Sequence, residues 1–332
     1  MRIAVLGAGA VGATLAALLA RQGHELEVTA RGDNLDAIQA NGLQLDGGWG
    51  SYTARVSAGS VLTTTPELAI LATKAQDAAG ALSGSAEVLQ AVPVLVVQNG
   101  LGGLRVAHET VPASPLLAGL ALFASSYVSP GHVTVTGANP MIIGAGPGTD
   151  AALLERVAAV LRPALPIEVT PDIEGAQWTK LLINHINALP AITGLSVQEV
   201  VADSGLRRVM AASMRETVRI ARNIGARFAR VQGVSGGILN LIGSAPLWVG
   251  EQFPRLLARR MGGVPNPGST LQSVRRGRLT EIDFLNGAVV EAAAEHGLVA
   301  PVNAAIVALV HDVERTGVFL TPADVIAKVP IS

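Results

Sequence analysis

The stretch RIAVLGAGAVGATLAALLARQG, residues 2–23, joins a short apolar run to a helical pattern through a glycine-rich turn. Residues 2–6 are apolar enough to predict a buried strand. Residues 13–23 carry apolar side chains at helical spacing and end at glycine, which predicts a helix. The turn GAGAVG (7–12) lies between them. The sequence therefore opens with a strand–turn–helix unit, the building block of an open α/β sheet.

The glycine spacing of this turn matches a pattern that binds dinucleotides. Gly7 permits the tight turn, Gly9 lets the backbone approach a pyrophosphate, and Gly12 lets the helix pack on the strand. The first turn of the helix then offers free N–H groups to the phosphates. A glycine-rich turn without a ligand is the alternative. The expected phosphate-binding residues are Gly7, Ala8, Gly9, Ala10, Val11 and Gly12.

The first half of the chain continues the alternation of strand and helix. Residues 24–30, 67–73 and 92–100 are apolar or β-branched runs that stop at polar residues, which is typical of a parallel sheet with crossover helices. Segments 116–128 and 132–144 flank Ser-Pro-Gly, so we expect them to form a hairpin at the edge of that sheet.

The second half has helical periodicity. Three prolines in residues 163–171 mark the change, and residues 231–268 are too rich in Gly and Pro for a firm assignment. We predict a Rossmann-type, doubly wound, mostly parallel α/β domain in residues 1–168 and an all-helical domain in residues 169–332. The helices are expected at 151–162, 174–192, 205–225, 269–276, 280–297 and 301–315.

Composition excludes several classes of protein. The chain has 332 residues, a net charge of −1 and only 15% charged residues, so it offers no basic surface for nucleic acid or an anionic membrane. The absence of cysteine excludes disulfides, thiolate metal sites and a cysteine nucleophile, and we expect no metal. No 18-residue apolar run occurs, and the first strand begins beside Met1. We therefore expect no membrane span, no signal peptide and a cytoplasmic protein.

The end of the second strand indicates which dinucleotide binds. An NAD site usually has an acid there for the ribose hydroxyls, whereas this chain has Ala30 followed by Arg31. Arg31 suits a 2′-phosphate, and Lys74, at another strand end, adds positive charge. The next acid, Asp33, is expected in a loop. We therefore expect NADPH/NADP rather than NAD, with ordinary surface cations as the alternative.

The run QNGLGG (98–103) follows another expected strand. Asn99 is then placed at the carboxyl edge of the sheet, where ligands bind in open α/β folds. The alternative for Asn99 is a turn residue preceding Gly100.

Polar residues interrupt the apolar helical stretch WTKLLINHINALPAITG (178–194). Lys180 and Asn184 are four residues apart and share a helix face, and Asn187 lies three further on along the same side. A buried lysine has a readily shifted pKa and can protonate an oxyanion during carbonyl reduction, while amides can bind a carboxylate or hydroxyl. The alternative is a lysine that reaches solvent, with asparagines bonding to nearby backbone. His185 points elsewhere, and we interpret it as structural.

A second polar cluster lies in Ser269–Gly287, which ends in TEIDFLNG. Thr280 is expected to cap a helix, with Asp283 at the capping-box position. Glu281 would then lie in the first helical turn, near a bend, where it could pair with Lys180 or bind a substrate hydroxyl. The alternative for Glu281 is favourable interaction with the helix dipole alone.

The combination of GAGAVG, Arg31, ATKA, QNG, WTKLLIN and TEIDFLNG resembles the ketopantoate reductases, or 2-dehydropantoate 2-reductases, over nearly the whole chain. The resemblance implies a Rossmann domain followed by a helical domain like that of 6-phosphogluconate dehydrogenase. It also implies the NADPH-dependent reduction of 2-ketopantoate to D-pantoate, a step towards pantothenate and coenzyme A.

Positions that match the family's motifs assign roles by resemblance. The catalytic residues fall on Lys180 and Glu281. The residues that contact substrate fall on Asn99, Asn184 and Ser269, and the helical stripe adds Asn187. The residues that hold the 2′-phosphate fall on Arg31 and Lys74, and Asn99 is also expected beside the cofactor.

Two departures from the family concern the substrate. Many members carry a second asparagine four residues after the position of Asn184, but this chain has Ala188, preceded by Asn187. Residues 231–268 are also longer than in compact members. Another 2-keto or 2-hydroxy acid therefore stays an alternative substrate, and a non-catalytic NADP-binding sensor is a further alternative. Apolar helices at 205–221 and 301–310 predict a homodimer.

Overall fold

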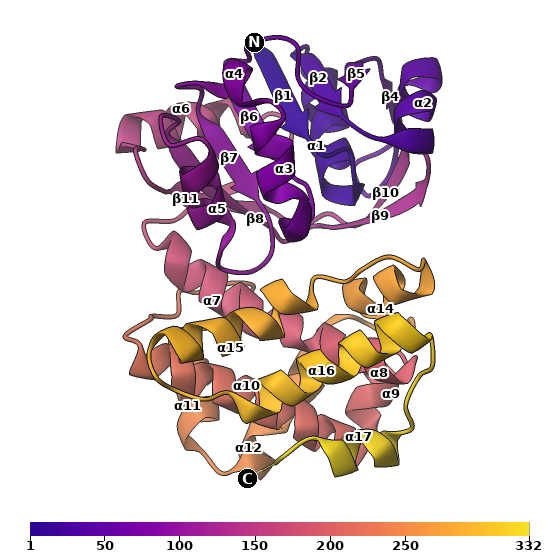
Figure 1. Ribbon diagram of the computed structural model, residues 1–332, viewed down its shortest axis with the longest axis vertical. Coiled ribbons are helices and arrows are strands. Elements are labelled where there is room, and N and C mark those ends of the chain that lie inside the picture. Colours follow the sequence, from indigo (N-terminus) through magenta and orange to yellow (C-terminus); the bar gives the residue numbers. More distant parts are fainter. Residues whose placement is uncertain (332) are drawn as a thin grey trace. The chain divides into compact units, whose positions relative to one another are not determined.

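The computed structural model describes residues 1–331 and contains two compact units, each of which is considered by itself (Figure 1). The first unit is Met1–Ile173 and the second is Glu174–Ser332, against an expected boundary between residues 168 and 169.

The first unit is built on an eight-stranded sheet. In spatial order its strands are β12 (Ile167–Val169), β11 (Met141–Ala145), β8 (Leu116–Ala121), β7 (Val94–Val97), β6 (Leu68–Leu71), β1 (Arg2–Leu6), β2 (Glu25–Thr29) and β5 (Ser57–Gly59). The strands β5, β2, β1, β6, β7 and β8 run parallel to one another, and β11 runs antiparallel to β8. From β1 the chain continues to β2 and β5 on one side of β1. It then returns to the other side of β1 to form β6, β7 and β8. This reversal creates a switch point between the carboxyl ends of β1 and β6, where open α/β sheets bind ligands.

Helices cover both faces of this sheet. Ile3 and Val5 of β1 belong to one buried cluster, whereas Ala4 and Leu6 belong to the other, because neighbouring strand residues face opposite sides. The helices of this unit are α1 (Ala10–Arg21), α2 (Gly32–Asn41), η1 (Ala75–Asp77), α3 (Ala78–Ser83), α4 (Ala86–Leu89), α5 (Gly103–Thr110) and α6 (Ala151–Leu161). Strands buried on both faces are the expected property of a doubly wound parallel sheet, so the predicted fold class is confirmed.

The expected hairpin is placed differently. β9 (Ala124–Ser129) and β10 (His132–Gly137) do pair antiparallel, but they join β3 (Leu43–Gly47) and β4 (Tyr52–Ala54) in a separate four-stranded sheet. The prediction is therefore correct for the outer parts of the two segments, β8 and β11, which pair antiparallel in the main sheet, and wrong for β9 and β10, which leave it. The main-sheet strands β8 and β11 are apolar on both faces, whereas β10 buries only alternate residues, Val133 and Val135. A strand that buries only one face can cover a helix, and the four-stranded sheet packs on α1.

The described part of the second unit is helical. Its helices are α7 (Ile173–Asn184), η2 (His185–Asn187), α8 (Ala188–Thr193), α9 (Val197–Ala202), α10 (Ser204–Asn223), α11 (Gly236–Ser244), α12 (Leu247–Gly250), α13 (Gln252–Arg260), α14 (Gly268–Arg275), η3 (Ile282–Phe284), α15 (Asn286–Glu295), α16 (Pro301–Thr316) and α17 (Pro322–Lys328). Figure 1 shows α10 surrounded by the other helices of this unit. In the described chain, no helix combines the length and apolar character that crossing a membrane requires.

The long segment at 231–268 forms α11, α12 and α13, and all three helices pack on α10. Arg207 of α10 anchors the segment, because its buried guanidinium lies 3.4 Å from a carboxylate oxygen of Glu251 and donates to the Val201 carbonyl at 2.8 Å. Most apolar residues of α10 and α16 are buried within this unit, whereas Ala304, Val307 and Ala308 of α16 line an open pocket on its surface. The homodimer expected from these helices stays a prediction.

Candidate active site

The glycine-rich turn has the geometry that its sequence predicted. Gly7 has φ +98°, and a Cβ added there would lie 2.8 Å from the Thr73 backbone nitrogen. A Cβ on Gly12 would lie 2.0 Å from the Gly7 carbonyl oxygen, so α1 could not approach β1. A Cβ on Gly9, in contrast, would meet nothing within 4 Å. Because Gly9 is exposed and caps the N-terminus of α1, the turn has room for a phosphate beside free N–H groups.

Two residues that sequence reasoning missed hold this turn. Thr29, at the end of β2, accepts hydrogen bonds from Gly7 N and Ala8 N, both at 2.9 Å. Asn34, in the first turn of α2, donates to the Ala8 carbonyl at 2.9 Å and accepts from Gly131 N at 2.8 Å. An asparagine soon after the second strand was the available signal, but its partners Ala8 and Gly131 belong to two segments that are remote from Asn34 in the sequence.

The expected cofactor residues converge on one edge of the sheet. Gly7, Arg31, Lys74 and Asn99 follow the carboxyl ends of β1, β2, β6 and β7, which are adjacent strands. Arg31 is exposed and caps α2, and Lys74 precedes η1. Asp33 lies in the first turn of α2 and not in a loop, so that expectation was wrong. An acid in a first turn is favoured by the helix dipole.

The helix expected at 174–192 is broken. α7 ends at Asn184, residues 185–187 form the 3₁₀ turn η2, and α8 follows. Pro190 explains the break, because its ring clashes with the carbonyl of Ile186 in a continuous α-helix and it has no N–H to donate. Side chains three residues apart are eclipsed in a 3₁₀ turn, so Asn187 still follows Asn184 along one face.

Lys180 lies one helical turn before Asn184 on α7 and is partly buried. Within residues 1–331 its ammonium forms no hydrogen bond or ion pair. Burial lowers the pKa of Lys180 from 10.5 to about 8. Lys180 and Asn184 therefore share one helix face, on which burial lowers the pKa of the amine.

A close approach brings Ser269 to the same region of the helical unit. Gly268, at the start of α14, has φ +71°, and a Cβ added there would lie 2.6 Å from Asn187 Oδ1. Only glycine allows this approach, which α14 makes as it packs on η2 and α8. Ser269 follows directly and is exposed.

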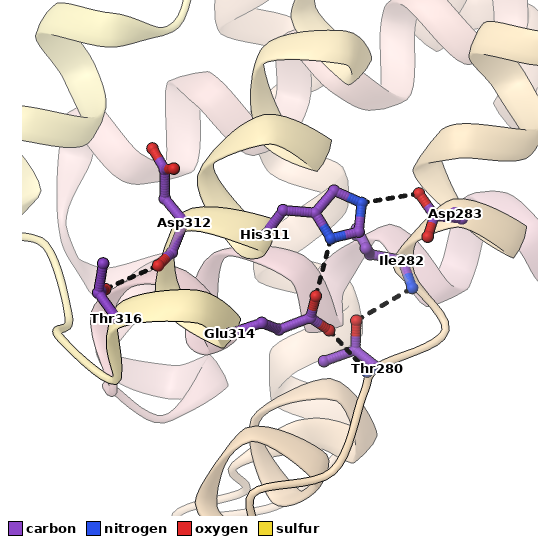
Figure 2. A network of polar contacts seen from close by, with 7 residues as sticks. All are labelled: Thr280, Ile282, Asp283, His311, Asp312, Glu314 and Thr316. Atoms are coloured by element: carbon purple, nitrogen blue, oxygen red, sulfur yellow. Dashed lines mark hydrogen bonds and ion pairs between the residues drawn. The ribbon is translucent and has the colours of Figure 1, made fainter.

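Glu281 precedes the short 3₁₀ turn η3, and α15 begins only at Asn286. The expected capping box is absent. The Thr280 hydroxyl accepts from Ile282 N at 3.2 Å, while Thr280 N donates to the carboxylate of Glu314 at 2.7 Å. Asp283 instead contacts His311 (Figure 2). Tertiary partners therefore replace the two local bonds of a capping box, and the prediction of a long helix starting at residue 280 was wrong.

His185 lies in a buried polar network within the helical unit. Its Nδ1 lies 2.9 Å from Ser213 Oγ, which donates to Asn303 Oδ1 at 2.8 Å, and Asn286 Nδ2 donates to the same oxygen at 2.8 Å. Burial lowers the pKa of His185 to about 3, so the ring is neutral at physiological pH. Among the described residues, no group of three or more His, Asp or Glu side chains is arranged to hold a metal ion.

These features define a class of protein, in which a Rossmann-type dinucleotide-binding unit is followed in the chain by a helical unit. The family described as "Ketopantoate reductase PanE/ApbA" matches residues 3–148, and its C-terminal counterpart matches residues 172–314. The chain belongs to this family, as its motifs predicted.

Curated relatives align with this chain over nearly their full length. The chain is 30% identical to 2-dehydropantoate 2-reductase of Halobacterium salinarum over 330 residues, which cover 96% of this chain and 100% of the relative. It is 29% identical to the enzyme of the same name from Pyrococcus horikoshii over 319 residues, with coverage of 96% and 99%.

Solved structures show the same architecture. A PanE/ApbA family ketopantoate reductase from Ralstonia eutropha JMP134 superposes with a TM-score of 0.82 at 29% identity, covering 95% of this chain and 99% of that one. A ternary structure of D-mandelate dehydrogenase with NADH and anilino(oxo)acetate has a TM-score of 0.80 at 22% identity, with coverage of 95% and 99%. At that identity the second likeness concerns the fold alone.

Proposed function

We propose that this chain uses NADPH to reduce the C2 carbonyl of 2-dehydropantoate to D-pantoate, a step towards pantothenate and coenzyme A. The observation that carries the proposal is Lys180, a partly buried amine with a pKa of about 8, in a chain that matches 2-dehydropantoate 2-reductases from end to end. A non-catalytic NADP-binding sensor has no use for such a proton donor.

The first unit would hold the cofactor, whose bound nicotinamide supplies the hydride. The N–H groups of residues 7–12 are suited to the pyrophosphate, because Gly9 leaves open space at the N-terminus of α1. Arg31 and Lys74 supply positive charge for a 2′-phosphate at the ends of β2 and β6. The absence of an acid at the end of β2 favours NADPH over NADH.

Lys180 would act as the general acid. As C2 of the keto acid accepts the hydride, negative charge develops on the carbonyl oxygen. The Lys180 ammonium gives a proton to that oxygen, which completes the alcohol, and the neutral amine recovers a proton from solvent. A pKa of about 8 keeps most of the lysine protonated at pH 7 while making the proton easier to transfer than from an ordinary lysine.

The amides and Glu281 would bind the substrate. Asn184 and Asn187 are neighbours on one face because η2 is a 3₁₀ turn, so Asn187 can occupy the place that a continuous α-helix would give to residue 188. We therefore assign Asn184, Asn187 and Ser269 to the carboxylate or hydroxyl end of the substrate, together with Asn99. Lys180 forms no ion pair with the described residues, so Glu281 is assigned to the substrate hydroxyl.

A second candidate is reduction of another 2-keto acid, which the buried Ala188 favours, because many family members have an asparagine at that position. Both candidates are tested by following NADPH oxidation with 2-dehydropantoate beside a panel of branched and aryl 2-keto acids. Selective turnover of 2-dehydropantoate supports the first. A better substrate in the panel supports the second, and tight NADPH binding without any turnover supports the sensor. Light scattering tests the homodimer, and cell fractionation tests the cytoplasmic location.

A further inference from the structure

The short turn that carries Glu281 is held from both ends by one helix, α16. Within the turn, the Thr280 hydroxyl accepts from Ile282 N at 3.2 Å, so these residues close around Glu281. Thr280 and Ile282 are buried, which fixes the backbone on each side of the glutamate. The orientation of Glu281 therefore depends on what anchors Thr280.

Glu314 of α16 is that anchor. One carboxylate oxygen accepts from Thr280 N at 2.7 Å, the other lies 2.7 Å from His311 Nδ1, and its side chain is only 9% exposed. Desolvation by itself would raise the pKa of Glu314, but hydrogen bonds from the Thr280 backbone, from His311 and from the Thr280 hydroxyl outweigh it and lower that pKa. The Glu314 carboxylate is therefore ionised, and each of its two oxygens has a hydrogen-bonding partner. A buried N–H bonded to an ionised carboxylate is among the stronger hydrogen bonds in proteins.

His311 extends the anchor to the far end of the turn. Its Nε2 lies 2.8 Å from Asp283 Oδ1, so the ring bridges Asp283 and Glu314 (Figure 2). Glu291 of α15 lines an open pocket together with Asp283 and His311, so a third carboxylate lies on this side of α16. The Asp283 and His311 side chains are 58% and 44% exposed, and ion pairs at such exposure contribute little energy. The buried hydrogen bond that Thr280 N donates to Glu314 is therefore stronger than the contact between Asp283 and His311.

We propose that Glu314 is a positioning residue for the reaction, which holds the Glu281 turn in place through the Thr280 N–H, with His311 as a secondary support. The proposal rests on the function proposed above, in which Glu281 binds the substrate hydroxyl. Glu314 touches neither substrate nor cofactor and acts only through the turn.

The test is a double-mutant cycle in the full-length protein. Variants Glu281→Ala, Glu314→Ala and the double variant are assayed for kcat/KM of the keto acid, and NADPH affinity is measured by fluorescence. We expect Glu314→Ala to lower kcat/KM roughly 10- to 100-fold, the scale of a small misplacement of a binding group, with NADPH affinity unchanged. In the Glu281→Ala background the same change should have no further effect, because the two residues act as one unit.

Two further variants separate positioning from general destabilisation. Glu314→Gln keeps an oxygen that can accept from Thr280 N, so it should retain most of the activity and stay folded if Glu314→Ala does not. Asp312→Ala is the matched control: Asp312 lies on the same helix, its carboxylate pairs with Arg315 at 3.0 Å, and it should behave like wild type.

Each remaining outcome overturns part of the reasoning. If Glu281→Ala impairs reduction while folded Glu314→Ala does not, or if their effects multiply, the positioning role is wrong and the proposed function stands. If Glu281→Ala has no effect, or wild type reduces no keto acid, the assigned role of Glu281 fails and this inference fails with it.

Discussion

The lowered pKa of Lys180 makes the pH dependence of the reaction the most direct test of its role. If Lys180 donates the proton, only the ammonium form is active, and kcat/KM reports the pKa of the free enzyme. With a pKa of about 8, the protonated fraction falls about tenfold between pH 7 and 9. An ordinary lysine, with a pKa of about 10.4, would stay almost fully protonated over that range.

The assay follows NADPH oxidation at subsaturating keto acid and saturating NADPH, at half-unit steps from pH 6 to 10. Lys180→Arg is the matched variant, because a guanidinium keeps its charge throughout and should leave a slow but flat profile. A wild-type profile that is flat to pH 9.5, or the same decline in Lys180→Arg, would refute the assignment of Lys180 as the general acid.

The burial of Lys180 has a second consequence, for stability. Its folded pKa of about 8 lies below the 10.5 of the unfolded chain, so the unfolded chain binds more protons between these values. The contribution of this group to stability therefore improves as pH rises through this window, and at pH 7 the buried charge destabilises the fold. Lys180→Met should raise Tm at pH 7 in calorimetry while abolishing reduction; a lower Tm contradicts this reasoning.

Three further predictions concern the turn, the cofactor preference and the buried histidine. Gly12→Ala should lower both Tm and NADPH affinity, because its Cβ would lie 2.0 Å from the Gly7 carbonyl oxygen, whereas Gly9→Ala, with nothing within 4 Å, should weaken NADPH binding at unchanged Tm. Arg31→Ala should weaken NADPH but not NADH in titrations, since only NADPH carries the 2′-phosphate; equal losses would contradict its role. The pKa of His185, about 3 in the fold against about 6.5 unfolded, means that stability falls as pH drops below 6.5, by about 3 kcal/mol at pH 4.5. Urea unfolding of wild type beside the non-titrating His185→Asn variant measures that loss, which should be missing from the variant.

The sequence by itself determined the features that depend on local geometry. GAGAVG predicted the strand–turn–helix at the switch point because backbone clearance at Gly7 and Gly12 admits no Cβ. Helical periodicity predicted α6, α10, α14 and α16 to within a residue or two, and α10 and α16 bury long apolar faces. The family followed from motifs of this kind, and the comparisons confirm it.

The tertiary structure alone decided which partner each polar or apolar group meets. A strand pattern shows that one face of β10 needs cover, but it does not show that α1 supplies the surface. TEID suggests a capping box, yet Glu314, 34 residues away, takes the Thr280 N–H. Asn34 likewise bonds to the Ala8 carbonyl, and Gly268 packs closely against Asn187; both partners are remote in the sequence. The physical reason is that a hydrogen-bonding group has several possible partners in an unfolded chain, and only packing selects the one that is close enough.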